Sequence, residues 1–237
     1  MNLQEAVDNY ETAMQHCDNL IETHRAPAKG QGRRTVETSI NRGTIVLAVA
    51  AWQAIIQDIA MVLRDELVAE AKNALGTRLL ADAIERWKMD FEVALKDFST
   101  PNPDNTRNLL KRVGFDPQSH WTWTQSGGRG NSSITVKPKH VRKVIFQWIR
   151  VRNDVAHGHT IITSLPILGA VRDPESSAGL VAAPTLRLDD AIACVKFFRS
   201  VARLTVEGAA SLLGEPIPTW KNLPSHALGL HVSHLPD

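Results

Sequence analysis

The sequence lacks most of the residue patterns on which metal-dependent and covalent enzymes are built. Its 237 residues include two cysteines, at positions 17 and 194, which excludes a zinc site made of thiolates. No Cys-x-x-Cys, His-Glu-x-x-His or Gly-x-Ser-x-Gly motif is present, and no Lys-Ser/Thr pair follows the glycines at 127, 128 and 130. Three histidines, at 226, 231 and 234, stand in a segment with the composition of a mobile tail. We therefore expect no metal and no other cofactor.

A large excess of charge and a long apolar run are also missing. The formal net charge is +2, so any contact with phosphate must come from a local patch of cations. The longest apolar run, 45–56, is interrupted by Gln53 and is too short to span a bilayer. The first five residues are acidic and amphipathic, unlike a signal peptide. We expect a soluble, cytoplasmic protein without a membrane partner, and the two cysteines suit a reducing compartment.

Apolar residues recur at steps of three and four along most of the chain, which predicts an all-α bundle of about six helices. Between the helices we expect a basic loop at 25–34, an irregular insertion with a short β-ribbon at 116–138, and a loop or hairpin at 160–184. The sequence predicts one helical domain over 1–214 and an extended tail over 215–237. The predicted helices cover 3–21, 36–70, 79–96, a short segment ending at 113, 138–158 and 188–213.

The most informative stretch is 152–158, which reads Arg-Asn-Asp-Val-Ala-His-Gly at the end of the most regular predicted helix. Cleavage of RNA without a metal needs a group that moves protons near neutral pH, and His157 suits this role. It also needs a cation on the phosphate, and the planar guanidinium of Arg152 matches phosphate oxygens. Asn153 lies four residues before His157, so its amide could orient the imidazole or hold the RNA backbone. Asp154 is expected to support the site, paired with an arginine or solvated.

The same stretch also fits an ordinary helix end. A histidine in the last turn complements the helix dipole, and the glycine after it accepts the left-handed conformation. The arginine and the asparagine are not needed for such a cap, which favours the chemical interpretation.

Further basic residues could follow an RNA backbone near these groups. Two tryptophans in the irregular insertion, Trp121 and Trp123, could stack on unpaired bases or anchor the loop on the bundle. The predicted RNA-binding cations are Arg33 and Arg34 in the first loop, and Lys139, Arg142 and Lys143 on the approach to the motif.

Together, the predicted bundle and the motif resemble the HEPN superfamily (higher eukaryotes and prokaryotes nucleotide-binding domains), most closely its bacterial RiboL-PSP-HEPN and related groups. The segment 148–158 matches the superfamily's signature of Arg, four intervening residues and His, with Asn directly after the Arg. The segment 41–58 is similar to the family's long second helix, and 98–115 to its connecting segment. Where the family often has Glu after the aromatic residue of that helix, this chain has Gln53, so an acid role at that position is in doubt and a supporting role is expected.

The resemblance implies a metal-independent endoribonuclease that acts as a dimer, often as a toxin or an effector of phage defence. It implies Arg152, Asn153 and His157 as active-site residues, with Gly158 structural. Because one histidine cannot readily serve on both sides of the phosphorus, we expect a homodimer with facing motifs, and an antitoxin or defence-system protein as a further partner. Two alternatives remain open: a catalytically silent HEPN module that binds RNA or a nucleotide as a sensor, and a structural bundle that dimerises and recruits a partner protein.

Overall fold

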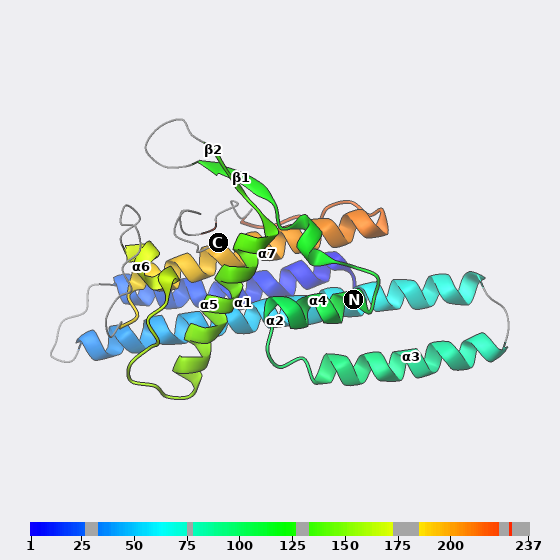
Figure 1. Ribbon diagram of the computed structural model, residues 1–237, viewed down its shortest axis with the longest axis horizontal. Helices are drawn as coiled ribbons and strands as arrows, with labels where there is room; N and C mark the ends of the chain where they lie inside the picture. The colour runs from blue at the N-terminus through cyan, green and yellow to red at the C-terminus, as the bar shows by residue number, and fades with distance from the viewer. Residues whose placement is uncertain (27–32, 75–77, 127–132, 173–184, 223–227, 229–237) are drawn as a thin grey trace.

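The computed structural model describes residues 1–26, 33–74, 78–126, 133–172, 185–222 and 228 (Figure 1). Of these residues, 76% are helical, which confirms the predicted all-α class. The predicted ribbon is also present, as an antiparallel pair of strands, β1 (Trp123–Ser126) and β2 (Ser133–Val136), in which Trp123 lies opposite Val136.

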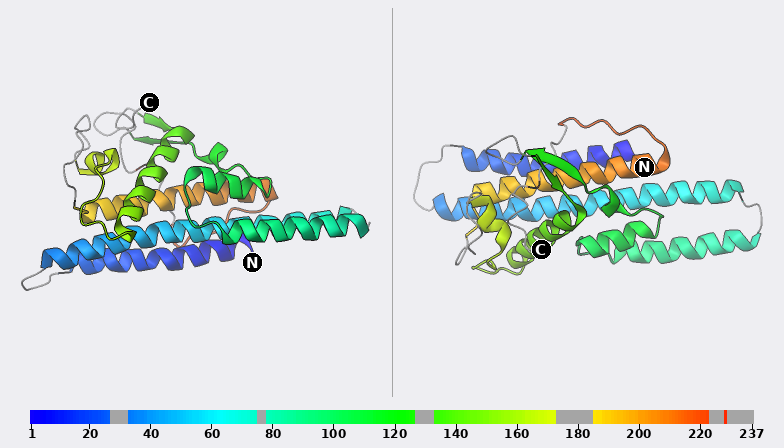
Figure 2. Two further views of the ribbon diagram at one scale, coloured as in Figure 1. Left: turned by 60° about the horizontal axis from the view of Figure 1, so that its bottom comes forward. Right: turned by 45° about the horizontal axis from the view of Figure 1, so that its top comes forward.

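Three long helices form the body of the molecule: α1 (Leu3–Arg25), α2 (Arg33–Ala74) and α7 (Leu188–Leu213). They lie side by side in both views of Figure 2, with α2 in contact with each of the other two. Asn2 and Glu5 close the start of α1 with a reciprocal capping box, and Gly214 ends α7 in the left-handed conformation at φ +68°. The start of α1 and the end of α7 are therefore fixed by local capping.

The centre of the core is Trp52 of α2, whose side chain is fully buried. Its ring lies 5.8 Å from that of Phe198 on α7 and 6.3 Å from that of Trp121 (centroid distances). Its indole N–H donates to the carbonyl of Pro101 (3.1 Å), while the indole N–H of Trp121 donates to the hydroxyl of Thr205 (3.0 Å). Both buried indoles thus have hydrogen-bond partners, as burial requires.

The helix that carries the motif, α5 (Pro138–Ala156), crosses α2 at a steep angle (Figure 2, left). It starts with a proline in its first turn, a position where no N–H is needed. Its buried stripe includes the predicted residues Val141, Val144, Ile145, Trp148 and Val151, which confirms the helical period of this segment.

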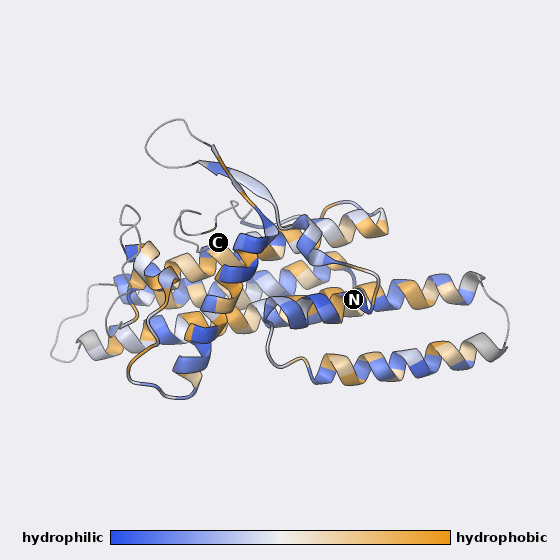
Figure 3. Cartoon of the chain, in the orientation of Figure 1, coloured by the Kyte–Doolittle hydropathy of each residue, from blue (hydrophilic) through white to orange (hydrophobic). Residues whose placement is uncertain are grey.

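The second half of α2 and helix α3 (Arg78–Lys96) project from the body as a two-helix arm (Figure 1). Hydrophilic and hydrophobic residues alternate along α3 in Figure 3, as expected for a helix with one neighbour. The chain returns to the body through α4 (Pro103–Lys111), whose start is capped by the Asn102 side chain, and a 3₁₀ turn, η1 (Pro117–His120).

Two local predictions were wrong. Arg33 and Arg34 belong to the first turn of α2 and not to the preceding loop. The predicted loop or hairpin at 160–184 contains a seven-residue helix, α6 (Pro166–Arg172). This helix is too short to show a clear period in the sequence, and its burial against α7 stabilises it. An ion pair between Arg172 and the fully buried Asp190, at 2.8 Å, joins the two helices.

The described part of the tail is extended and packs on α1. The Gln4 side-chain amide makes two hydrogen bonds with the backbone of Thr219 (2.8 and 2.9 Å), like one rung of a sheet. The buried Trp220 meets Tyr10 edge to face, with ring centroids 6.1 Å apart. Residue 228 is also buried, and the three histidines of the tail lie outside the described residues.

By length and composition, α2 has one segment, Thr35–Lys72, that could cross a membrane. In its most apolar window 56% of the residues are buried inside the structure, where α1, α5 and α7 surround the helix. Its central position in the bundle accounts for the apolar composition. The expected cytoplasmic location stays a prediction.

The close contact between α7 and η1 generates a stability prediction. A Cβ atom added at Gly208 would meet the His120 ring at 2.5 Å, whereas one added at Gly43 would meet only a Leu20 methyl at 3.9 Å. We expect Gly208→Ala to destabilise the fold by about 1–3 kcal/mol through overpacking. Gly43→Ala should stabilise it by about 0.5–1 kcal/mol, because alanine favours the helix. Urea denaturation of both variants measures the difference, and equal midpoints would contradict the close packing at His120.

Candidate functional site

The C-terminal end of α5 has a fixed backbone. The His157 N–H donates to the carbonyl of Asn153 (2.9 Å), and Gly158 is left-handed at φ +74°. The Gly158 N–H then donates to Val155 (3.0 Å) and the His159 N–H to Asp154 (2.9 Å), the pair of bonds that defines a Schellman motif. The side chain of His157 is exposed at this end. The backbone is thus held in place while the imidazole can meet a ligand.

Asp154 holds the loop that follows α5. Its carboxylate is almost fully buried and accepts a hydrogen bond from the Thr163 N–H at 2.7 Å. Its other oxygen lies 3.4 Å from Nδ1 of His159. Burial alone would raise the pKa of Asp154, but the bonds from Thr163 and the neighbouring imidazole of His159 outweigh it and lower the pKa. Asp154 therefore supports the site through the loop and His159, and not through an arginine.

This loop brings a second imidazole to the motif. The ring centroids of His157 and His159 lie 6.2 Å apart, and both side chains are exposed. Two titratable groups thus stand close together in one chain, where the sequence predicted one.

Arg152 is partly buried and has no carboxylate partner among the described residues. Its Nη2 lies 3.4 Å from the carbonyl oxygen of Ser99, a long contact, and burial lowers the pKa of its guanidinium. The same linker is held by Gln53, whose Nε2 donates to the carbonyl of Phe98 at 2.7 Å. Gln53 thus holds the segment beside Arg152, and its expected supporting role in the site stays a prediction.

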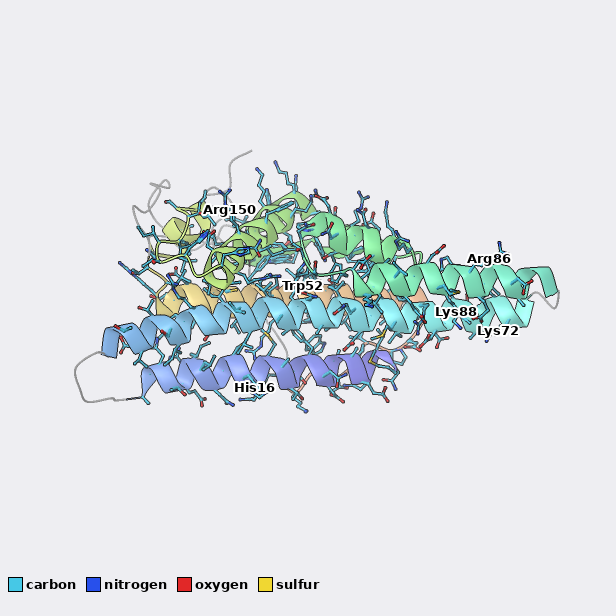
Figure 4. All side chains as sticks on the ribbon, turned by 90° about the horizontal axis from the view of Figure 1, so that it is seen from below. His16, Trp52, Lys72, Arg86, Lys88 and Arg150 are labelled. Carbon is cyan, nitrogen blue, oxygen red and sulfur yellow. The ribbon has the colours of Figure 1, made fainter. Side chains whose placement is uncertain are left out.

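Two more guanidinium groups near the motif also lack a carboxylate in the described part of the chain. Arg42 of α2 donates to the carbonyl of Thr160 at 2.8 Å, in the loop after the motif, and its buried Nε has no hydrogen-bond partner there. Arg150 is exposed and lies on α5, on the other side of α2 from His16 (Figure 4). By contrast, six arginines elsewhere bind carboxylates: Arg64, Arg107, Arg142, Arg172, Arg199 and Arg203.

These three cations give the end of α5 a positive field. The helix dipole places roughly half a negative charge at the same end, which opposes an anion. Three guanidinium groups outweigh this partial charge together with the carboxylate of Asp154, the one acidic residue on α5. The local charge therefore favours binding of an anion such as phosphate.

The side-chain amide of Asn153 makes no hydrogen bond with the His157 imidazole in the described structure but lines a groove of about 390 Å³ beside α5. Arg150 and the exposed Phe146 line the same groove, together with Leu165 from the far side. Lys143, Phe146, Arg150, Asn153 and His157 follow one another at steps of three and four, so they share one face of α5.

The remaining predicted RNA-binding residues differ in their availability. Arg142 is bound to Asp104 at 2.7 Å, whereas Lys143 is half-buried on the α5 face. Lys139 is exposed. The side chains of Arg33 and Arg34 lie outside the described residues.

Base stacking on Trp121 and Trp123 is contradicted by their burial, at 0% and 6% exposed. Trp121 anchors the insertion on α7 through Thr205, which was the alternative interpretation, while the Trp123 indole bonds to Gln125 of its own strand.

The described residues contain no group of three or more His, Cys, Asp or Glu side chains placed to hold a metal ion. No protein-family model, no curated protein and no solved structure matches the chain. The resemblance to the HEPN superfamily thus rests on the motif and its position at the end of a late helix.

Sequence reasoning missed Arg42, His159 and Phe146. Phe146 and Arg150 could have been found from the step of three and four that leads back from His157. His159 lies two residues beyond the motif, and its approach depends on how the Asp154 loop folds. Arg42 comes from another helix, and its contact with Thr160 spans 118 residues of sequence, so no local pattern indicates it.

The Asp154 loop predicts a dependence of stability on pH. Because the pKa of Asp154 is lower in the folded protein than its ordinary value near 4, its contribution is present above about pH 4 and is lost as the pH falls through the folded pKa. At pH 7, Asp154→Asn should lower the free energy of unfolding by about 1 kcal/mol, since a charge-assisted bond becomes a neutral one.

The difference from wild type should shrink in acid. Asp104→Asn, which removes an exposed ion pair, is the matched control and should change stability little at any pH. Denaturation curves at several pH values make the comparison, and a constant difference down to pH 3 would argue against a charged Asp154 in the fold.

Proposed function

We propose that the protein is a metal-independent endoribonuclease whose active site lies at the C-terminal end of α5. The observation that supports this most is the combination of two exposed imidazoles, of His157 and His159, with three guanidinium groups that lack carboxylate partners in the described structure. Proton-transfer groups beside a site for phosphate are what cleavage of RNA at neutral pH requires.

RNA supplies its own nucleophile. The 2′-hydroxyl oxygen attacks the adjacent phosphorus while one imidazole takes its proton, and the P–O2′ bond forms as the P–O5′ bond breaks. The second imidazole gives a proton to the departing 5′-oxygen. The products are a 2′,3′-cyclic phosphate and a 5′-hydroxyl, and the enzyme needs no oxidant, reductant or metal.

In this proposal, His157 and His159 act on opposite sides of the phosphate. Their ring centroids are 6.2 Å apart, close enough for both rings to contact the oxygens of one phosphate group. Asp154 orients His159, and Arg152 stabilises the negative charge that builds up on the phosphorane oxygens. Arg42 and Arg150 add to the field that attracts the strand.

The homodimer expected from the sequence is a second way to supply both groups, with His157 of each copy facing the other. The described structure favours the version within one chain, because the Asp154 loop already holds a second imidazole beside the first. A toxin or phage-defence role under the control of an antitoxin or other partner protein belongs to the proposal as the setting implied by the resemblance.

The proposal predicts separate losses for the two central residues. His157→Ala should reduce cleavage of RNA at least about 100-fold, the usual contribution of a general acid or base. It should change stability by only about 0.3–1 kcal/mol, the value of a histidine at a helix end. Arg152→Lys should also be strongly impaired, since an ammonium cannot reproduce the two parallel bonds of a guanidinium.

The control is His16→Ala, which removes an exposed histidine of α1 (Figure 4) and should cleave like wild type. Cleavage of a fluorescent RNA, with product ends identified by mass spectrometry, measures all four proteins. If the His157→Ala protein cleaves at the wild-type rate, the site is not at α5. If wild type binds RNA without cleaving it, the silent binding module is the better account.

Mixing the two variants tests whether the two imidazoles of one active site come from one chain or from two copies. If His157 and His159 of one chain act together, His159→Ala should be as inactive as His157→Ala, and an equimolar mixture should not regain activity. Light scattering gives the mass of the active species against 26.1 kDa for one chain. A fully active His159→Ala protein with twice that mass would instead assign the second imidazole to a partner copy.

A further inference from the structure

We infer that the groove beside α5 binds one unpaired base of the RNA, preferably guanine, within a few nucleotides of the bond that is cleaved. The position of this base relative to the cleaved bond rests on the proposed function, but the binding of a base can be tested without cleavage. It concerns the groove lined by Phe146, Gln147, Ile149, Arg150, Asn153 and Leu165.

The groove has the apolar walls that a base requires. Phe146 is 44% exposed, and no other Phe, Trp or Tyr among the described residues is exposed. Exposing an aromatic ring leaves apolar area in water, which costs free energy that a stacked base would recover. Ile149 and Leu165 are buried residues that line the groove with it. Stacking on an aromatic side chain stabilises a bound base by about 1–3 kcal/mol.

Most polar side chains of the groove can donate hydrogen bonds, including those of Thr100 and Asn102, which also line it. The Asn102 oxygen already accepts from backbone N–H groups, which leaves its amide nitrogen as a donor. Arg150 offers a guanidinium that has no ion-pair partner among the described residues, and Gln147 offers its amide nitrogen because its oxygen already accepts from the Ile167 N–H at 2.7 Å. The Asn153 amide can donate as well. Guanine presents two acceptors, N7 and O6, on one edge, and a guanidinium pairs with both. The donor-rich lining therefore favours guanine over the other bases.

The position of the groove fixes where this base lies in the strand. At 1.5 Å per residue, Arg150 lies about 10 Å and Phe146 about 16 Å from His157 along α5. The base in the groove is therefore within a few nucleotides of the cleaved bond. Lys143 and Arg150 stand on the same face of the helix and can meet the phosphates on either side.

An apolar partner helix fits the groove less well. It would bury Arg150 and Asn153 without partners, at a cost that the few apolar residues could not offset. A strand of RNA satisfies both, since its phosphates and base edges are acceptors.

The test uses a uridine oligonucleotide with 2′-O-methyl sugars, which cannot be cleaved, carrying one guanosine at each position in turn. At one position, replacing guanosine by an abasic site should weaken binding to the wild-type chain by about 5- to 100-fold, as loss of one stacked base predicts. Replacing it by adenosine should weaken binding less. Fluorescence anisotropy at fixed salt measures each affinity.

Variants connect this loss to the groove. In Phe146→Ala the guanosine and abasic strands should bind alike, whereas Met89→Ala, which removes an exposed side chain on the α3 arm, should keep the full difference. The Arg150→Ala protein should still bind the abasic strand more weakly than the guanosine strand, but it should no longer prefer guanosine to adenosine. The inference would be overturned if the abasic site weakened binding equally in Phe146→Ala and Met89→Ala. It would also be overturned if the abasic site weakened binding to wild type at no position.

The two proposals can fail separately. Suppose that the abasic site weakens binding to wild type but not to Phe146→Ala (the coupling to Phe146), while unmodified RNA is not cleaved. The groove then binds a base and the nuclease proposal is wrong. If unmodified RNA is cleaved with the expected dependence on His157 but without any coupling to Phe146, the nuclease stands and the base site does not.

Discussion

The fold depends on the need to bury most of the apolar middle of α2. Between Ile45 and Leu63 this helix is largely apolar and most of its residues are buried, so no single neighbour can shield it from water. Helices α1 and α7 cover it along its length, and α5 crosses it. Trp52 lies where these elements meet, and its indole reaches the linker before α4. The place of α5, and with it the motif, follows from the burial of α2.

The candidate site combines a rigid frame with exposed chemistry. The Schellman bonds and the Asp154 carboxylate fix the backbone from Asn153 to Thr163, while the two imidazoles remain open to solvent. Positive charges gather here without the carboxylates that bind arginines elsewhere in the described chain. Such an arrangement stabilises the folded protein less than a set of ion pairs would, which is the usual relation between a site and its fold.

The sequence predicted well what local periodicity controls. The spacing of apolar residues located the long helices and the buried stripe of α5, and the glycines at 114, 158 and 214 marked turns with positive φ. It did not predict α6, because seven residues carry too little periodic signal and Arg172 finds its partner in another helix. The approach of Arg42 and His159 to the motif also escaped prediction, since each depends on a tertiary contact. The burial of Trp121 could not be decided from its glycine-rich neighbourhood, because its partner Thr205 lies 84 residues away.

The contact between the start of α1 and the extended segment after α7 bears on how the chain folds as it is made. Gln4 pairs with a residue 215 positions later, and Tyr10 meets Trp220 from the same segment. During translation, α1 leaves the ribosome long before Thr219 and Trp220, so Gln4 and Tyr10 lack these partners until the intervening residues are made. Domains whose early and late segments pair in this way complete their cores only after most of the chain is synthesised. In the cell, the ring of Tyr10 would therefore stay without its Trp220 partner while residues 11–219 are being made.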